Sequence, residues 1–175
     1  SFVKSWAPVR TVKEGCDPNV FSSQDMRLWC AWMGNRITTQ NKLFSEKHFP
    51  NKPVNSCKLR EAHLDFSDNG IADDCLMFLL NWLQSKRVRV RVLKLCGNQL
   101  TDGGLKSILD HVVHQEDKPY HELSLSRNKF SAQVLKELLV AINNHPAYPR
   151  LVCIEKSTEV RHMPLMLHAT KCGMA

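Results

Sequence analysis

The side chains in this 175-residue chain that could carry covalent or metal chemistry are its cysteines and histidines. Cys96, Cys153 and His63 could approach one another on one face of the fold, as a thiol nucleophile with its base or as metal ligands, although two or more strands would separate them. No motif joins these three residues. His111 and His114 have helical ligand spacing, but two histidines at a helix end are usually solvated. We therefore expect neither a catalytic residue nor a bound metal.

The number and spacing of the cysteines point to a redox environment rather than to a reaction. The chain holds seven, an odd number, and no two form a Cys-x-x-Cys pair. Scattered thiols of this kind are typical of a reducing intracellular compartment, although one disulfide would fit the same count. Gly103-Gly104 lacks the Lys-Ser/Thr of a phosphate-binding loop, so no cofactor is expected. The longest apolar run, Cys75 to Leu80, is too short to cross a bilayer.

Positive charge is the first indication of a partner. The formal net charge is +7 and the isoelectric point is about 9.1, a balance that favours binding to nucleic acid or to an anionic surface. Residues 1–57 hold eight Lys or Arg against four Asp or Glu, whereas residues 58–157 are nearly balanced, with fourteen against twelve. One dense group, the basic cluster, consists of Lys86, Arg87, Arg89 and Arg91. It could contact phosphate or an acidic protein, or be a solvated loop that discourages aggregation at a strand.

Three segments of the chain share one pattern of apolar residues and asparagine. Each has two apolar residues separated by one position, with an Asn three positions after the second. The segments are Leu64–Ile71, Leu93–Leu100 and Leu123–Phe130. Their asparagines, Asn69, Asn98 and Asn128, are 29 and 30 residues apart. A fourth, degenerate copy spans Val152–Ser157, and repetition at this period is typical of an array of similar structural units.

Each residue type in the repeat has a physical role. The two apolar residues alternate with polar ones, as in a short strand with one buried face. An asparagine amide both donates and accepts hydrogen bonds where the chain turns, so the three asparagines are expected to form a structural ladder. Apolar residues at helical spacing follow every turn, and Leu76, Leu105 and Leu135 recur seven residues after the asparagine. The pattern therefore predicts alternating strands and helices.

This pattern resembles the L-x-L-x-x-N-x-L core of leucine-rich repeats. A period near 29 with one helix in each unit is similar to the ribonuclease-inhibitor-like subclass. The resemblance covers about residues 58–157 and implies an α/β fold, a short right-handed solenoid with parallel strands on the concave face and helices on the convex face. The chain departs from the family at the strand starts, where Glu61, Val90 and Tyr120 stand at the usual leucine position and only Val90 fits it well.

The repeats are expected to lie between a cap and a tail. Residues 1–57 show no repeat and are predicted to form a mainly helical N-terminal cap and linker. Its helix is capped by Ser22 or Ser23, with Asp25 three residues after Ser22 in capping-box style, and ends at Gly34-Asn35. Residues 58–157 hold three full repeats and the degenerate terminal copy. Residues 158–175 form a C-terminal cover or a partner-binding strip, and the sequence does not separate these two roles.

The first repeat helix carries a second apolar pair beside its core stripe. Phe78 and Trp82 are four residues apart and therefore lie on one side of that helix. The pair is expected to pack against the cap through Trp29 or Trp32, and the alternative is a partner-binding site.

The strand positions that alternate with the buried residues face the concave surface of such a fold. They include Asp65, Ser67, Lys94, Cys96, Ser124, Ser126, Arg127 and Glu155. This surface is polar and of mixed sign, and repeat proteins use such faces to bind proteins more often than for catalysis. We therefore expect a non-catalytic protein–protein interaction module or scaffold, a subunit of a larger assembly. The alternative is a nucleic-acid-associated accessory domain that uses the basic cluster and the basic N-terminal cap.

Overall fold

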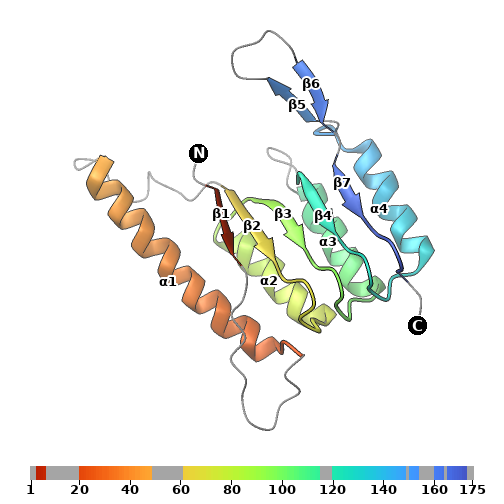
Figure 1. The fold of residues 1–175 in the computed structure, drawn as a ribbon, viewed down its shortest axis with the longest axis horizontal. Helices are drawn as coiled ribbons and strands as arrows, with labels where there is room; N and C mark the ends of the chain where they lie inside the picture. Colours follow the sequence, from red (N-terminus) through yellow and green to blue (C-terminus); the bar gives the residue numbers. More distant parts are fainter. Residues whose placement is uncertain are drawn as a thin grey trace.

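The computed structural model describes residues 3–6, 20–48, 61–114, 120–148, 150–153, 160–163 and 165–172. These residues form a five-stranded parallel sheet in the order β1-β2-β3-β4-β7, a separate antiparallel pair β5-β6, and four helices (Figure 1). The strands are β1 (Val3–Trp6), β2 (Glu61–Asp65), β3 (Val90–Lys94), β4 (Glu122–Ser124), β5 (Arg150–Cys153), β6 (Val160–Met163) and β7 (Met166–His168). The helices are α1 (Ser23–His48), α2 (Asp73–Ser85), α3 (Asp102–His114) and α4 (Ala132–Asn144). The predicted α/β class with parallel strands is confirmed.

Three strand–turn–helix units form the centre of the sheet. β2 is followed by α2, β3 by α3 and β4 by α4, and Figure 1 shows α2 and α3 on one side of the strands. The register aligns Leu64 with Leu93 and Leu93 with Leu123, so the first leucines of the units stack across neighbouring strands. All three are buried in one core between the sheet and the helices. In the described part of the chain, no helix combines the length and apolarity that crossing a bilayer requires.

The Asn98 side chain joins two units at the turn after the strands. Its Oδ1 atom accepts hydrogen bonds from the backbone N–H groups of Asn69 at 3.2 Å and Ile71 at 2.9 Å. Its Nδ2 atom donates to the carbonyl oxygens of Phe66 and Leu95, both at 2.9 Å. One buried amide therefore satisfies backbone groups of its own unit and of the preceding one, where water has no access.

Asn128 makes three matching contacts one unit later. Its Nδ2 atom donates to the carbonyl oxygens of Leu95 and Leu125, both at 2.8 Å, and its Oδ1 atom accepts from the N–H group of Leu100 at 3.2 Å. Asn98 and Asn128 thus form a directional series in which each side chain reaches back to the unit before it, whereas the Nδ2 atom of Asn69 donates to the Ser67 carbonyl oxygen of its own unit at 2.7 Å.

Aspartates at the helix starts make a second set of bonds between units. Asp73, the first residue of α2, accepts a hydrogen bond from the N–H group of Thr101 at 2.8 Å, just before α3. Asp102, the first residue of α3, accepts from the N–H group of Ser131 at 2.7 Å. Ser131 is the N-cap of α4. The hydrogen bond from the Ser131 backbone N–H group is the main reason that the pKa of the Asp102 carboxyl group is lowered.

The α1 helix begins as predicted but ends later. The Ser22 N–H and hydroxyl groups donate to Asp25 Oδ2 at 3.1 and 2.6 Å, and the Asp25 N–H group donates back to Ser22 Oγ at 3.2 Å, which forms the predicted capping box. The predicted end at Gly34-Asn35 is wrong, because the helix continues to His48. Beyond the glycine, Ile37 still packs against the core, so tertiary contacts carry the helix through a residue that favours termination.

The sheet gains an edge strand from the N-terminal region. β1 pairs in parallel with β2, with Val3 opposite Glu61 and Trp6 opposite Leu64. This strand was not predicted from the sequence, because Val3–Trp6 lies outside the asparagine repeat. The N-terminal region is therefore helical only in part.

The strand next to β4 is β7, and not the degenerate repeat predicted at Val152–Ser157. β5 contains the first residues of that copy but pairs antiparallel with β6 in the separate sheet. β7 lies parallel to β4 with Leu167 opposite Leu123, and Leu167 packs against the core. The tail therefore covers the end of the sheet with its own strand.

The residues after β7 repeat the turn that ends the earlier units. Lys171 has a positive φ of 55°, as Arg127 has at 58°, and the Arg127 N–H group donates to the carbonyl oxygen of Thr170 at 3.0 Å. Cys172 follows in the place of the asparagine, and its thiol donates to the Leu125 carbonyl oxygen at 3.4 Å. The terminal turn lies 44 residues after Asn128 rather than 29 or 30, because the β5-β6 hairpin comes between them.

Replacing Asn98 with leucine is expected to lower the free energy of unfolding by about 1–3 kcal/mol, because buried N–H and carbonyl groups of two units lose their partner. Chemical denaturation measures this change. Gln99→Leu is the matched control, because Gln99 is exposed and uses only its backbone N–H group in the turn. Equal stability of the two variants would contradict the role assigned to Asn98.

Asp102→Asn is expected to reduce stability at neutral pH and to have no such effect in acid. The folded pKa of Asp102 is lowered, so its carboxylate stabilises the protein above its unfolded pKa of about 3.9, and this contribution is lost as the pH falls through the folded pKa. Denaturant midpoints of both proteins between pH 7 and pH 2 measure the difference, which should close at low pH. Asp110→Asn removes a charge from the same helix without removing the Ser131 bond, and a pH profile identical to that of Asp102→Asn would refute this account.

Candidate functional site

The side of the sheet away from α2 and α3 is the candidate site, and we call it the open face. Its side chains alternate along each strand with the buried leucines. They are His63 and Asp65 of β2, Val92 and Lys94 of β3, Glu122 and Ser124 of β4, and Met166 and His168 of β7. The structure thus brings the predicted residues of β2, β3 and β4 onto one sheet and adds two residues of β7 that the sequence analysis missed.

An ion pair joins two strands on the open face. Lys94 Nζ lies 3.5 Å from Glu122 Oε1, and the two side chains are 40% and 19% exposed. Partly exposed pairs of this kind contribute at most about 1 kcal/mol to stability. The pair therefore fixes where one positive and one negative group stand more than it stabilises the fold.

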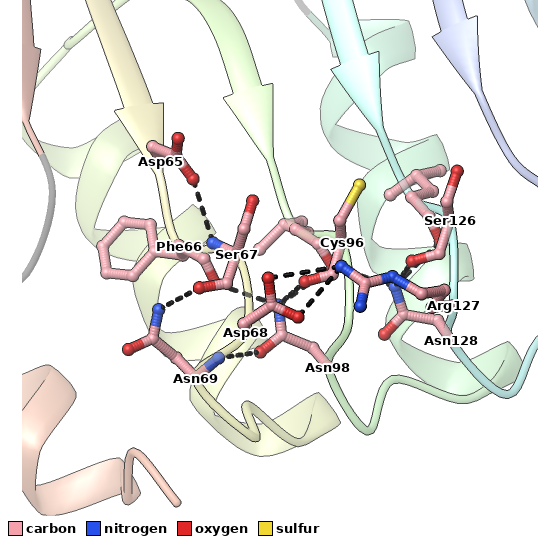
Figure 2. Close-up of polar contacts among 12 residues, drawn as sticks. Asp65, Phe66, Ser67, Asp68, Asn69, Cys96, Asn98, Ser126, Arg127 and Asn128 are labelled. Carbon is pink, nitrogen blue, oxygen red and sulfur yellow. Dashed lines mark hydrogen bonds and ion pairs between the residues drawn. The ribbon is translucent and has the colours of Figure 1, made fainter. Parts of the chain in front are cut away.

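A second ion pair crosses the turns that end the strands. Arg127 Nη2 lies 3.0 Å from Asp68 Oδ1 and 3.2 Å from Asp68 Oδ2, and Figure 2 shows the guanidinium reaching from the third unit to the first. Gly97 of the middle unit lies beneath this bridge at φ 64°, and a Cβ atom there would overlap Asp68 Oδ1. The glycine thus supplies both the left-handed backbone and the space that the pair requires.

Small polar residues form a row between the open face and the turns. The predicted members Ser67, Cys96 and Ser126 are all partly buried, and Figure 2 shows them at successive turns. Thr170 occupies the next place, and its N–H and hydroxyl groups lie 3.1 and 3.2 Å from Ser126 Oγ. The row was predicted to end at Glu155, which lies outside the described residues.

Asp65 supports this row from the last position of β2. Its Oδ1 atom accepts a hydrogen bond from the Ser67 N–H group at 3.0 Å (Figure 2), so the carboxylate is held at the end of the strand. Ser124, two strands away on β4, is buried. The open face therefore combines a fixed acid, an ion pair and small polar side chains.

The structure does not bring together the thiols and the imidazole that the sequence analysis considered, Cys96, Cys153 and His63. Cys153 belongs to β5 in the separate sheet, away from the row that contains Cys96. Cys30 and Cys75 are buried in α1 and α2, and burial raises the pKa of each thiol to about 12, which keeps both protonated. Within the described ranges, no group of three or more His, Cys, Asp or Glu side chains could hold a metal ion.

The basic cluster lies at the opposite end of β3 from the turns. Lys86 and Arg87 are exposed between α2 and β3, and Arg87 has a positive φ of 52°. Arg89 and Arg91 are partly buried, and the Arg91 guanidinium contacts the His121 ring on the next unit. Only half of the cluster is therefore presented fully to solvent.

The second apolar pair on α2 lies against α1. The rings of Trp29 and Trp82 are 6.1 Å apart in an edge-to-face arrangement, and the guanidinium of Arg27 stands 4.6 Å from the centre of the Phe78 ring. Of the two tryptophans considered, Trp29 makes the contact and Trp32 is 54% exposed. Phe78 and Trp82 thus take part in the packing of α1 on the first unit.

No family model, no curated protein and no solved structure matches the chain.

Gly97→Ala is expected to lower the free energy of unfolding by at least about 1 kcal/mol, because alanine is strained at φ 64° and its Cβ atom displaces Asp68. A double-mutant cycle separates the two causes. In the Asp68→Ala background, Gly97→Ala should lower the free energy of unfolding by less, since only the backbone strain remains. Strictly additive effects would show that the ion pair and the glycine are independent.

Proposed function

We propose that the chain is a short leucine-rich-repeat module of the ribonuclease-inhibitor-like kind, which binds a protein partner without catalysis. The repeated strand–turn–helix units and the asparagine series support the repeat assignment. The observation that carries the function is the open face, a sheet surface left uncovered by α2 and α3 on which side chains of both signs are held in place. Such a surface suits a scaffold or a subunit of a larger assembly.

The distribution of charge favours a protein over a nucleic acid as the partner. The open face carries two carboxylates, Asp65 and Glu122, and one ammonium group, Lys94, and Asp68 pairs with Arg127 at its edge. Phosphate backbones select surfaces of uniform positive charge, whereas mixed charges in fixed positions recognise a complementary pattern of side chains. The exposed Lys86 and Arg87 remain the feature on which nucleic-acid binding would depend.

Exchange of the two charges in the ion pair tests this function. In the double variant Lys94→Glu/Glu122→Lys the pair and the net charge are kept, but the pattern presented to a partner is inverted. Proteins that copurify with the full chain, quantified by mass spectrometry, are expected to fall at least about tenfold. The matched control is Lys106→Glu/Glu137→Lys, which exchanges exposed charges on α3 and α4 and should retain the partners.

Retention of the same proteins by the open-face variant would overturn the proposal. Loss of the copurifying proteins on nuclease treatment, together with steep weakening by salt and by neutralisation of Lys86 and Arg87, would instead assign the chain to nucleic acid.

A further inference from the structure

We propose that one side of α4 is a second docking surface, which receives an amphipathic, acidic α-helix of a protein partner. The surface consists of Leu135, Leu139 and Ile142, and we call it the α4 flank. These residues are spaced i, i+4 and i+7 and therefore share one side of the helix. This surface is separate from the open face, so the inference stands independently of the function proposed above.

The repeat itself identifies what is missing beside α4. Residues at the same place in successive units become more exposed along the chain. Leu80 of α2 is 4% exposed, Leu109 of α3 is partly buried and Leu139 of α4 is 53% exposed. The position seven residues after the asparagine changes in the same direction, since Leu105 is fully buried and Leu135 only partly.

The cause of this gradient is the order of the helices. α2 is covered by α3, and α3 by α4, whereas Figure 1 shows α4 as the last helix of the row. β7 extends the sheet past the α4 unit, but within the described residues it is followed by a turn and not by a helix. The place that a helix of the β7 unit would occupy is the one beside the α4 flank, so a helix is the shape that fits there.

The polar bonds between units distinguish a partner helix from a further repeat of the same kind. Asp73 and Asp102 each accept the backbone N–H group that precedes the next helix, but the equivalent first residue of α4 is Ala132, which cannot. Cys172 likewise replaces the asparagine and supplies a thiol donor without an amide oxygen. The α4 unit lacks the helix-start carboxylate, and the turn after β7 lacks the asparagine amide, so neither polar group that holds a following unit is present. The apolar α4 flank remains, which favours a partner that binds by burying side chains.

Charge at this end of the molecule selects an acidic helix. Lys129, Lys136 and Lys171 are exposed around the start of α4 and the turn after β7. Among the described residues of α4 and β7, Glu137 is the one acidic side chain, and it lies away from the flank on the helical wheel. An apolar stripe edged by Asp or Glu would therefore meet complementary charge.

The test uses the full chain and a displayed library of amphipathic helices with Glu and Lys varied at the positions beside the apolar stripe. Selection is expected to enrich acidic helices, whose affinity is then measured by fluorescence anisotropy. Leu139→Gln should weaken binding at least about tenfold, because it removes a leucine from the contact. Val140→Gln is the matched control, since Val140 is equally exposed at 51% but points about 100° further round the helix.

Several outcomes would overturn the inference. These are the enrichment of no amphipathic helix, enrichment of basic helices, or equal effects of the two substitutions. Sedimentation of the chain alone tests whether a second copy of the chain occupies the α4 flank. A dimer that Leu139→Gln dissociates would assign the flank to that second copy. Both side chains are exposed, so unchanged melting of the two variants is expected and separates loss of binding from loss of fold.

Discussion

The turn that follows each of β2, β3 and β4 is the constraint on which the structure depends. The outer residues of these turns reach solvent, but an asparagine is buried on the inner side, where backbone N–H and carbonyl groups need partners that water cannot supply. An amide side chain meets both needs at once, and Asn98 does so for two units together. Because Asn98 and Asn128 reach back to the preceding unit, they also fix the register in which the leucines of neighbouring strands stack.

Much of the central fold is predictable from the sequence, since its signals are periodic. Alternation with period two marks β2, β3 and β4, and helical spacing marks the helices that follow. The edge strands give no such signal, because β1 and β7 lie outside the asparagine repeat and are defined by the strand they pair with. The last turn is hidden for another reason: Cys172 stands where asparagine is expected, and the β5-β6 hairpin breaks the spacing.

The candidate site was predictable as a set of positions but not as a set of contacts. Alternation along the strands places Asp65, Lys94 and Ser124 on one side of the sheet. The ion pair between Asp68 and Arg127 spans three units and depends on Gly97 between them, so no local sequence pattern predicts it. Side-chain pairing over long distances in sequence follows from backbone geometry, which the repeat pattern specifies only in outline.

The hairpin between α4 and β7 also affects the order in which the protein assembles. Leu64 and Leu93 pair across 29 residues, whereas Leu123 and Leu167 pair across 44, and Val3 and Glu61 across 58. Contacts between near neighbours in sequence generally form faster, so we expect the inner strands to create a nucleus that the edge strands join later. The entropy of closing the longer loops differs little, but the edges are short and have few contacts to hold them. We therefore expect the two edges of the sheet, of which β7 borders both proposed surfaces, to detach at a lower free energy than the inner strands.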